Sequence, residues 1–205
     1  MRRLLHDQSG ASAAEFSLVL PLLILLLFGM IDTGRYMWEY NRAEKATQMG
    51  ARMAVVTDVI STGLGTYDFV QPSGLTQGDN IPANAIAPIT CTDDGTTSTC
   101  SCTASGASIC PPGYATGSHT AFLNILDRMK AMYPNLTAAN VQIIYSGSGL
   151  GYAGDPNGMD IAPLVTVRLI NVKFKALTSL MLANINMPDF ASTLTAEDSS
   201  GNVSN

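Results

Sequence analysis

The feature that most constrains the fold is an apolar run near the N-terminus with the length of a membrane span. Residues 16–31 (FSLVLPLLILLLFGMI) carry no charge, and as a helix they would cover about 24 Å. With residues 11–15 added, the helix would reach about 31 Å, the thickness of a hydrocarbon core. We therefore expect a transmembrane helix over about residues 16–33. It has Glu15 at its leading edge and Pro21 in its interior.

The charges that flank this run set its expected orientation. Arg2 and Arg3 precede it, and the positive-inside preference places the short N-terminus in the cytoplasm and the rest of the chain outside. A cleaved secretory signal is the alternative, but the residues after the apolar core (FGMIDTGRYMWEY) offer no small-x-small cleavage site. An uncleaved membrane helix is therefore the preferred interpretation.

The helix is expected to continue beyond the membrane. Residues 33–60 contain no proline, and their apolar and small residues recur at steps of three and four, with charged residues largely between them. This spacing is typical of an amphipathic helix. We predict a helix over about residues 11–60, amphipathic over about 34–60, that follows a leader of residues 1–10 and precedes an extracytoplasmic domain of residues 61–205.

The outer domain combines one helix with several strands. Within residues 117–134, one stripe of apolar residues predicts a helix that ends before Pro134. Three segments rich in Val, Ile and Thr predict strands, at residues 140–146, 163–177 and 190–198. Residues 61–117 have the composition of loops. The predicted fold class is α+β, with the amphipathic half of the long helix packed on a small antiparallel sheet.

Four cysteines lie close together in the loop-rich region of the expected exported domain: Cys91, Cys100, Cys102 and Cys110. In that compartment two disulfides are the natural interpretation. A bridge between Cys100 and Cys102 would close a very tight ring, so two pairings stay open: Cys91 with Cys100 and Cys102 with Cys110, or the crossed pair. The spacing is unlike common zinc sites, and no metal is expected. The bridges would staple a loop.

The sequence offers little support for catalysis or for nucleic-acid binding. The chain has two histidines, His6 and His119, and no nucleophile has an identifiable base near it in sequence. No Lys or Arg occurs between Arg52 and Arg128, so a basic nucleic-acid footprint is not expected. We predict neither an enzyme nor a bound cofactor.

Glu15 needs a physical explanation. A carboxylate in a membrane helix costs roughly 2.5–3.5 kcal/mol at mid-depth, and less near the edge. If the chain were cut after Gly10, a new α-amine would appear on Ala11, and in a bundle of copies one subunit's amine could neutralise another subunit's carboxylate. Pro21 removes one backbone donor and clashes with the carbonyl of Ser17, so a local kink is expected there.

This arrangement resembles the type IV pilins and their minor relatives, in which a short basic leader ends in Gly and Glu stands at the fifth mature position. The string GASAAEFSLVLPLLILLLFGMIDTGRYM resembles, more specifically, the TadE-like minor pilins, or pseudopilins, of tight-adherence (Flp) pilus systems. That group also has Glu-Phe after Ala-rich residues, Leu-Pro within the helix, and a Gly-x-x-x-x-Gly-Arg exit, here Gly29, Gly34 and Arg35. Further on, NRAEKATQMGARMAV resembles the family's Ala-rich continuation.

The resemblance implies a function in assembly. A prepilin peptidase would cut between Gly10 and Ala11, and Glu15, Phe16 and Pro21 would act in subunit packing. The implied partners are inner-membrane lipid, the peptidase, other pilin subunits and the Tad secretion machinery. The implied location is the inner membrane, in a single pass, with possible incorporation into an extracellular pilus. The alternative is an unprocessed single-pass membrane protein whose outer domain binds a surface or partner.

Overall fold

The computed structural model describes residues 9–70, 74–156, 158–177 and 185–197. Its elements, in chain order, are α1 (Ser9–Ala54), α2 (Thr62–Gly65), β1 (Ile89–Asp93), β2 (Ser98–Cys102), β3 (Thr116–Gly117), α3 (His119–Lys130), the 3-10 helix η1 (Ala138–Asn140), β4 (Val141–Ser146), β5 (Leu164–Leu169), β6 (Lys173–Phe174), β7 (Ile185–Asn186) and β8 (Phe190–Thr195). The chain divides into two units, one of residues 1–40 and 173–187, the other of residues 41–172 and 188–205.

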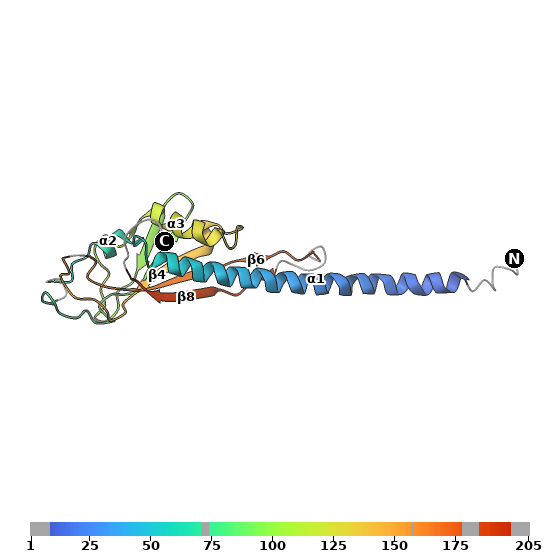
Figure 1. The fold of residues 1–205 in the computed structure, drawn as a ribbon, viewed down its shortest axis with the longest axis horizontal. Helices are drawn as coiled ribbons and strands as arrows, with labels where there is room; N and C mark the ends of the chain where they lie inside the picture. Colours follow the sequence, from blue (N-terminus) through green and yellow to red (C-terminus); the bar gives the residue numbers. More distant parts are fainter. Residues whose placement is uncertain (1–8, 71–73, 157, 178–184, 198–205) are drawn as a thin grey trace. The chain divides into compact units, whose positions relative to one another are not determined.

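The larger unit is built on a six-stranded sheet in the order β3-β2-β1-β4-β5-β8. Every pair of neighbouring strands is antiparallel, which confirms the predicted α+β class and the antiparallel sheet. The central strands alternate buried and half-buried residues, as strands with one face on a core do. Figure 1 shows β4 and β8 in this unit together with α3.

Small residues on α1 let the helix approach the sheet closely. Residues 43, 46, 47, 50, 51, 53 and 54 are buried, so the predicted amphipathic stripe is present. A Cβ added at Gly50 would lie 2.7 Å from Met129 Sδ of α3 and 3.3 Å from Val167 Cγ1 of β5. The absence of a side chain at Gly50 therefore brings α1, α3 and β5 together. The helix ends at Ala54, six residues before the predicted Ile60.

Helix α3 follows the predicted stripe. Its buried residues are Ala121, Phe122, Ile125, Leu126 and Met129, and the Ser118 side chain caps its first turn by accepting a hydrogen bond from the Ala121 N–H. Asp127, Arg128 and Lys130 lie in its last turn, where the two cations suit the negative end of the helix dipole.

Two expectations about the strands need correction. Residues 61–117, predicted as loop, contain β1, β2 and β3, because β1 pairs with the core strand β4 over residues 89–91. The predicted strand over 163–177 is two strands, since Asn171 has φ 55° and breaks the extended backbone between β5 and β6.

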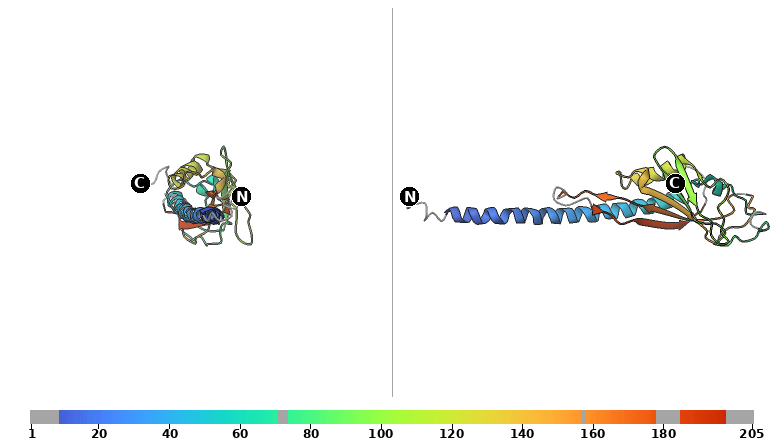
Figure 2. Two further views of the ribbon diagram at one scale, coloured as in Figure 1. Left: turned by 90° about the vertical axis from the view of Figure 1, so that its right-hand side faces the viewer. Right: turned by 180° about the vertical axis from the view of Figure 1, so that it is seen from behind.

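The smaller unit contains the N-terminal part of α1 and the two-stranded β6–β7 hairpin. Lys173 pairs with Asn186, and Phe174 pairs with Ile185, in an antiparallel register. α1 itself is one unbroken helix that contributes residues to both units (Figure 2).

Candidate membrane and assembly segment

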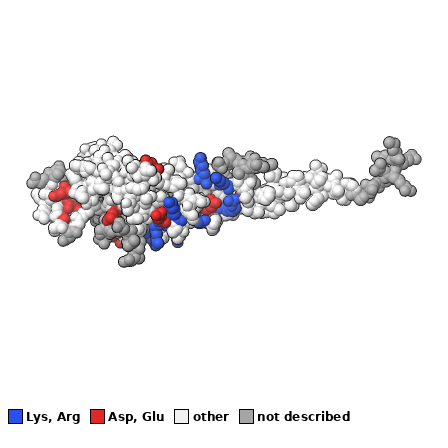
Figure 3. All heavy atoms as spheres, turned by 90° about the horizontal axis from the view of Figure 1, so that it is seen from above, with Lys and Arg blue, Asp and Glu red and all other residues white. Residues whose placement is uncertain are grey.

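The apolar stretch of α1 has no protein packed around it in the structure. Every large hydrophobic side chain between Phe16 and Ile31 is exposed, and Leu18 reaches 80%. Among the described residues, α1 is the one helix long and apolar enough to cross a membrane. A patch of this size on a protein surface marks an interaction with lipid or with other proteins. Within the smaller unit, this stretch of α1 is free of Lys and Arg on the face seen in Figure 3.

The residues predicted for processing and packing lie at the start of this helix. α1 begins at Ser9, so the bond between Gly10 and Ala11 falls in its first turn. Glu15 and Phe16 follow one turn later, and both side chains are exposed. Within the described part of the chain, no residue forms a hydrogen bond or ion pair with Glu15. A partner for this carboxylate would therefore come from the leader, from lipid or from another molecule.

Pro21 lies inside α1, and the helix continues on both sides of it. The Ser17 hydroxyl, which stands one turn before the proline, donates to the carbonyl of Ala14 at 2.8 Å. It therefore does not compensate for the donor that Pro21 lacks. The carbonyl of Ser17 thus lacks its usual donor within the helix, and a neighbouring helix could supply one.

Polar groups gather where the apolar stretch ends. Asp32 follows Ile31 directly and is buried, at 8% exposure. Its Oδ1 accepts a hydrogen bond from the Leu177 N–H at 2.7 Å and lies 3.4 Å from an Arg35 guanidinium nitrogen. The Arg35 guanidinium also lies 5.5 Å from the centre of the Phe174 ring. The exit of the span is thus held to the β6–β7 hairpin by hydrogen bonding, charge and cation–π contact.

The four cysteines form two disulfides, Cys91–Cys100 and Cys102–Cys110, so one of the two open pairings is realised. Cys91 and Cys100 stand directly opposite each other in the β1–β2 ladder, with their Cα atoms 4.0 Å apart. The second bridge joins the end of β2 to the loop before β3. The bridges therefore fasten a sheet edge and its following loop, and not a loop alone.

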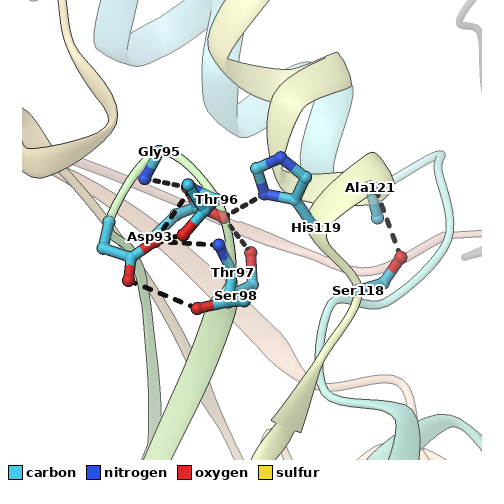
Figure 4. Close-up of polar contacts among 9 residues, drawn as sticks. Asp93, Gly95, Thr96, Thr97, Ser98, Ser118, His119 and Ala121 are labelled. Atoms are coloured by element: carbon cyan, nitrogen blue, oxygen red, sulfur yellow. Dashed lines mark hydrogen bonds and ion pairs between the residues drawn. The ribbon is translucent and has the colours of Figure 1, made fainter.

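A second polar cluster joins the β1–β2 hairpin to the start of α3, as Figure 4 shows. The Asp93 carboxylate is buried and accepts hydrogen bonds from the Ser98 hydroxyl and from the Gly95 N–H at 2.7 Å. Its Oδ2 lies 2.6 Å from His119 Nδ1. Burial raises the pKa of Asp93, but the hydrogen bonds from Ser98, His119 and Gly95 together hold that pKa below its usual range.

This cluster contains Ser, His and Asp, yet its geometry is structural. The Ser98 hydroxyl donates to Asp93, so the carboxylate stands between the hydroxyl and the imidazole. In a nucleophilic triad the imidazole contacts the hydroxyl and the carboxylate orients the imidazole. In the observed order the Ser98 hydroxyl contacts the carboxylate and lacks the imidazole base that a triad requires. Its role is to tie β1, β2 and the start of α3 together.

A hollow of about 450 Å³ is lined mainly by residues 65–68, 154–156 and 158–160. Asp160 is buried at its wall, and its carboxylate accepts the N–H groups of Phe69, Gly154 and Asp155 at 2.8–2.9 Å. These bonds occupy the carboxylate with backbone amides. Among the described residues, no three His, Cys, Asp or Glu side chains are grouped as metal ligands.

The comparison with protein families bears on the N-terminal helix. Residues 10–52, about a fifth of the chain, match a family model described as TadE-like protein. This segment is TadE-like. The match begins at the predicted cleavage site and takes in the whole apolar stretch, so the predicted resemblance is confirmed. No curated protein and no solved structure matches the chain.

The TadE-like segment associates the chain with Tad pili, and the apolar helix fits a membrane anchor in a pilus protein. The roles of Gly10, Ala11, Glu15, Phe16 and Pro21 stay predictions.

Sequence reasoning missed two pairs of interacting residues, one at the end of the apolar stretch of α1 and one in the sheet unit. The bond from Leu177 to Asp32 joins residues 145 positions apart, and the pair of Asp93 with His119 joins residues 26 apart. Asp32 gave one usable signal, because a carboxylate directly after a membrane span usually has a partner. Asp93 and His119 gave none, since neither belongs to a periodic pattern.

Proposed function

We propose that the chain is a minor pilin, or pseudopilin, that takes part in the assembly of a Flp-type (Tad) pilus. A prepilin peptidase would cut it between Gly10 and Ala11. Residues 1–10 would be the cytoplasmic leader, residues 16–33 would span the inner membrane, and residues 61–205 would form the outer domain. Cleaved subunits would leave the lipid, and their apolar helices would pack together in a helical bundle.

One observation carries this proposal: on the exposed apolar helix of the TadE-like segment, Glu15 is the fifth residue after Gly10. The unpaired carboxylate and the α-amine that cleavage would create have opposite charges. In a staggered bundle, the amine of one copy could lie beside the carboxylate of the next. In the low dielectric of such a bundle, an ion pair is much stronger than in water.

The decisive measurement is the N-terminal mass of the mature protein isolated from its native membrane. A mass that begins at Ala11 is the expected result. Replacing Gly10 by Ala should leave the leader attached, while Gly29→Ala, a matched change within the apolar stretch where a Cβ would meet nothing within 4 Å, should not. A native protein that retains Met1 would contradict processing.

A second experiment separates packing from processing. Glu15→Ala should be cut normally but enter pili poorly, because its carboxylate is proposed to act between subunits. Glu44→Ala is the control, since Glu44 is an exposed glutamate farther along the same helix. Pilus fractions would be compared by immunoblot. Equal incorporation of Glu15→Ala and the wild type would contradict the ion-pair mechanism.

The alternative, an unprocessed membrane-anchored binding protein, has one observation in its favour. The bond between Gly10 and Ala11 lies inside the first turn of α1, so a peptidase would have to open helical hydrogen bonds to reach it. In that case the outer domain, with its two disulfides, would be the functional part. The same mass measurement decides between the two functions.

A further inference from the structure

The β6–β7 hairpin lies against α1 just where the apolar stretch ends, and two contacts fix its direction. The Phe174 ring meets the Tyr36 ring edge-on, with centroids 5.4 Å apart, and the Leu177 N–H bonds to Asp32. As the chain proceeds from Phe174 to Leu177, its contact on the helix moves back from Tyr36 to Asp32. The segment after β6 therefore runs against α1, toward the span, and Leu177 reaches the residue that follows Ile31.

The two faces of this segment differ in character. Phe174 and Ala176 are buried at 1% and 7% exposure. Lys173, Lys175 and Leu177, which alternate with them, are exposed. On the partner strand, Ile185 is exposed but pairs directly with Phe174, so its side chain lies on the face of Phe174 and not on that of the lysines. The outer face thus has lysines farther from the span and an aliphatic residue at its end.

The position of this face along α1 matches that of the interfacial layer of a bilayer. The interfacial layer extends roughly 5–8 Å beyond the hydrocarbon core, and the four helical steps from Asp32 to Tyr36 cover about 6 Å. Leu177 therefore stands at the edge of the hydrocarbon, and Lys175 stands at the depth of the headgroup phosphates. Figure 3 shows Lys and Arg side chains gathered where the apolar stretch of α1 ends.

We propose that this face, made of Lys173, Lys175 and Leu177, binds the surface of the leaflet in which the span ends. The two ammonium groups would contact the phosphates of anionic lipids, and the Leu177 side chain would enter the interfacial layer. Lysine stems suit this position because they bury apolar carbons and keep their charge in water. Anionic lipid is the favoured occupant because the face is cationic and continuous with the membrane span. The inference does not depend on cleavage after Gly10.

The test uses the full chain in nanodiscs. The described residues contain no free cysteine and all four cysteines of the chain are in disulfides, so Leu177→Cys would offer one site for an environment-sensitive fluorophore. Lipids with a spin label near the headgroup should reduce the emission from this site. Leu150→Cys, with 55% exposure against 57% for Leu177, is the matched control and should keep its emission.

The charge contribution is measured with a second set of variants. Each lysine near an anionic surface is worth about 1 kcal/mol, which is about fivefold in an equilibrium. Lys173→Gln with Lys175→Gln should therefore lower the preference of the face for anionic over zwitterionic lipid about 25-fold, read as the ratio of quenching by spin-labelled phosphatidylglycerol to quenching by spin-labelled phosphatidylcholine. Lys130→Gln is the control, and in discs of phosphatidylcholine alone the double variant should match the wild type.

Other results would overturn the proposal. If spin-labelled lipid does not reduce emission, but disulfide cross-links form between Leu177→Cys copies placed in one disc, the face binds a second copy. If neither occurs, the face stays in water. If Leu150→Cys is quenched as strongly as the hairpin site, the quenching is not specific to the hairpin, and the assignment of this face is wrong.

Discussion

The buried carboxylate of Asp93 offers a sharp test of how the disulfide-bonded hairpin is held to the rest of the sheet unit. The variant Asp93→Asn keeps the size of the side chain and removes its charge. Hydrogen bonds to a charged group contribute about 1.5–3 kcal/mol, against about 0.5–1.5 kcal/mol for neutral pairs. Three donors reach this carboxylate, from Gly95, Ser98 and His119. A loss of about 1 kcal/mol at each predicts that Asp93→Asn is less stable by about 3 kcal/mol.

This difference is measurable by thermal unfolding of the full chain in detergent, followed by circular dichroism. For a chain of this size, about 1 kcal/mol shifts the midpoint by about 2–4 °C, so Asp93→Asn should unfold about 6–12 °C lower than the wild type. Asp94→Asn is the matched control. Asp94 is the next residue, and Thr96 and Thr97 donate to its carboxylate within the same turn. Because this turn is exposed, water can replace those hydrogen bonds, so the loss at Asp94→Asn should be much smaller.

The dependence on pH gives a second, independent check. The pKa of Asp93 lies below its usual range in the folded protein and near about 3.9 in the unfolded chain. Its stabilising contribution is therefore complete above about pH 4 and is lost as the pH falls through the folded value. The gap between wild type and Asp93→Asn should close on acidification below about pH 4. A gap that is absent at neutral pH, or one that persists unchanged in acid, would refute the role given to this carboxylate.

Three further changes test the packing of the same unit. Gly63→Ala would place a Cβ 2.3 Å from a backbone carbonyl oxygen of the facing turn, so we expect a loss of about 3 kcal/mol in thermal unfolding; an unchanged midpoint would contradict this close approach. Replacing Cys102 and Cys110 together by Ser removes a bridge that closes a short loop and should cost about 2.5 kcal/mol; peptide mapping without reductant checks the pairing first, and a crossed pattern would contradict it. Tyr145→Phe leaves the Ile60 N–H without the hydroxyl that accepts it at 3.1 Å, which should cost about 1–3 kcal/mol, and a loss below about 0.5 kcal/mol would indicate that water takes the hydroxyl's place.

Much of this fold could be predicted from local sequence. The length of the apolar run of α1 predicts a membrane helix. The stripe on α3 and the Val-rich and Ile-rich strands β4 and β5 each follow one period, and that period indicates which face is buried. The ends of the elements were less predictable. α1 ends at Ala54 without a stop signal in the sequence, and the positive φ of Asn171 separates β5 from β6.

Strands β1 and β2 could not be recognised locally. Their sequences, ITCTD and STCSC, consist mostly of Thr, Ser and Cys, which is also the composition of turns. They are strands because β4 offers a paired edge to β1 and because the bridge between Cys91 and Cys100 crosses the ladder. The two disulfide pairings could not be distinguished from sequence for the same reason, because the register that places Cys91 opposite Cys100 is set by the pairing of the strands.

The membrane and assembly segment of α1 combines apolar residues that suit two environments with one charged residue, Glu15, that does not. The exposed apolar side chains of residues 16–31 are equally suited to lipid and to neighbouring apolar helices, so they do not favour one environment strongly. In the proposed function, Glu15 discriminates between them. Even if its place near the membrane edge lowers the cost of the unpaired carboxylate to about 1 kcal/mol, that cost shifts the equilibrium about fivefold toward any state that supplies a cation. A single carboxylate next to a surface that tolerates both environments is therefore enough to bias a subunit from the bilayer toward a bundle, provided that the bond before Ala11 is cut.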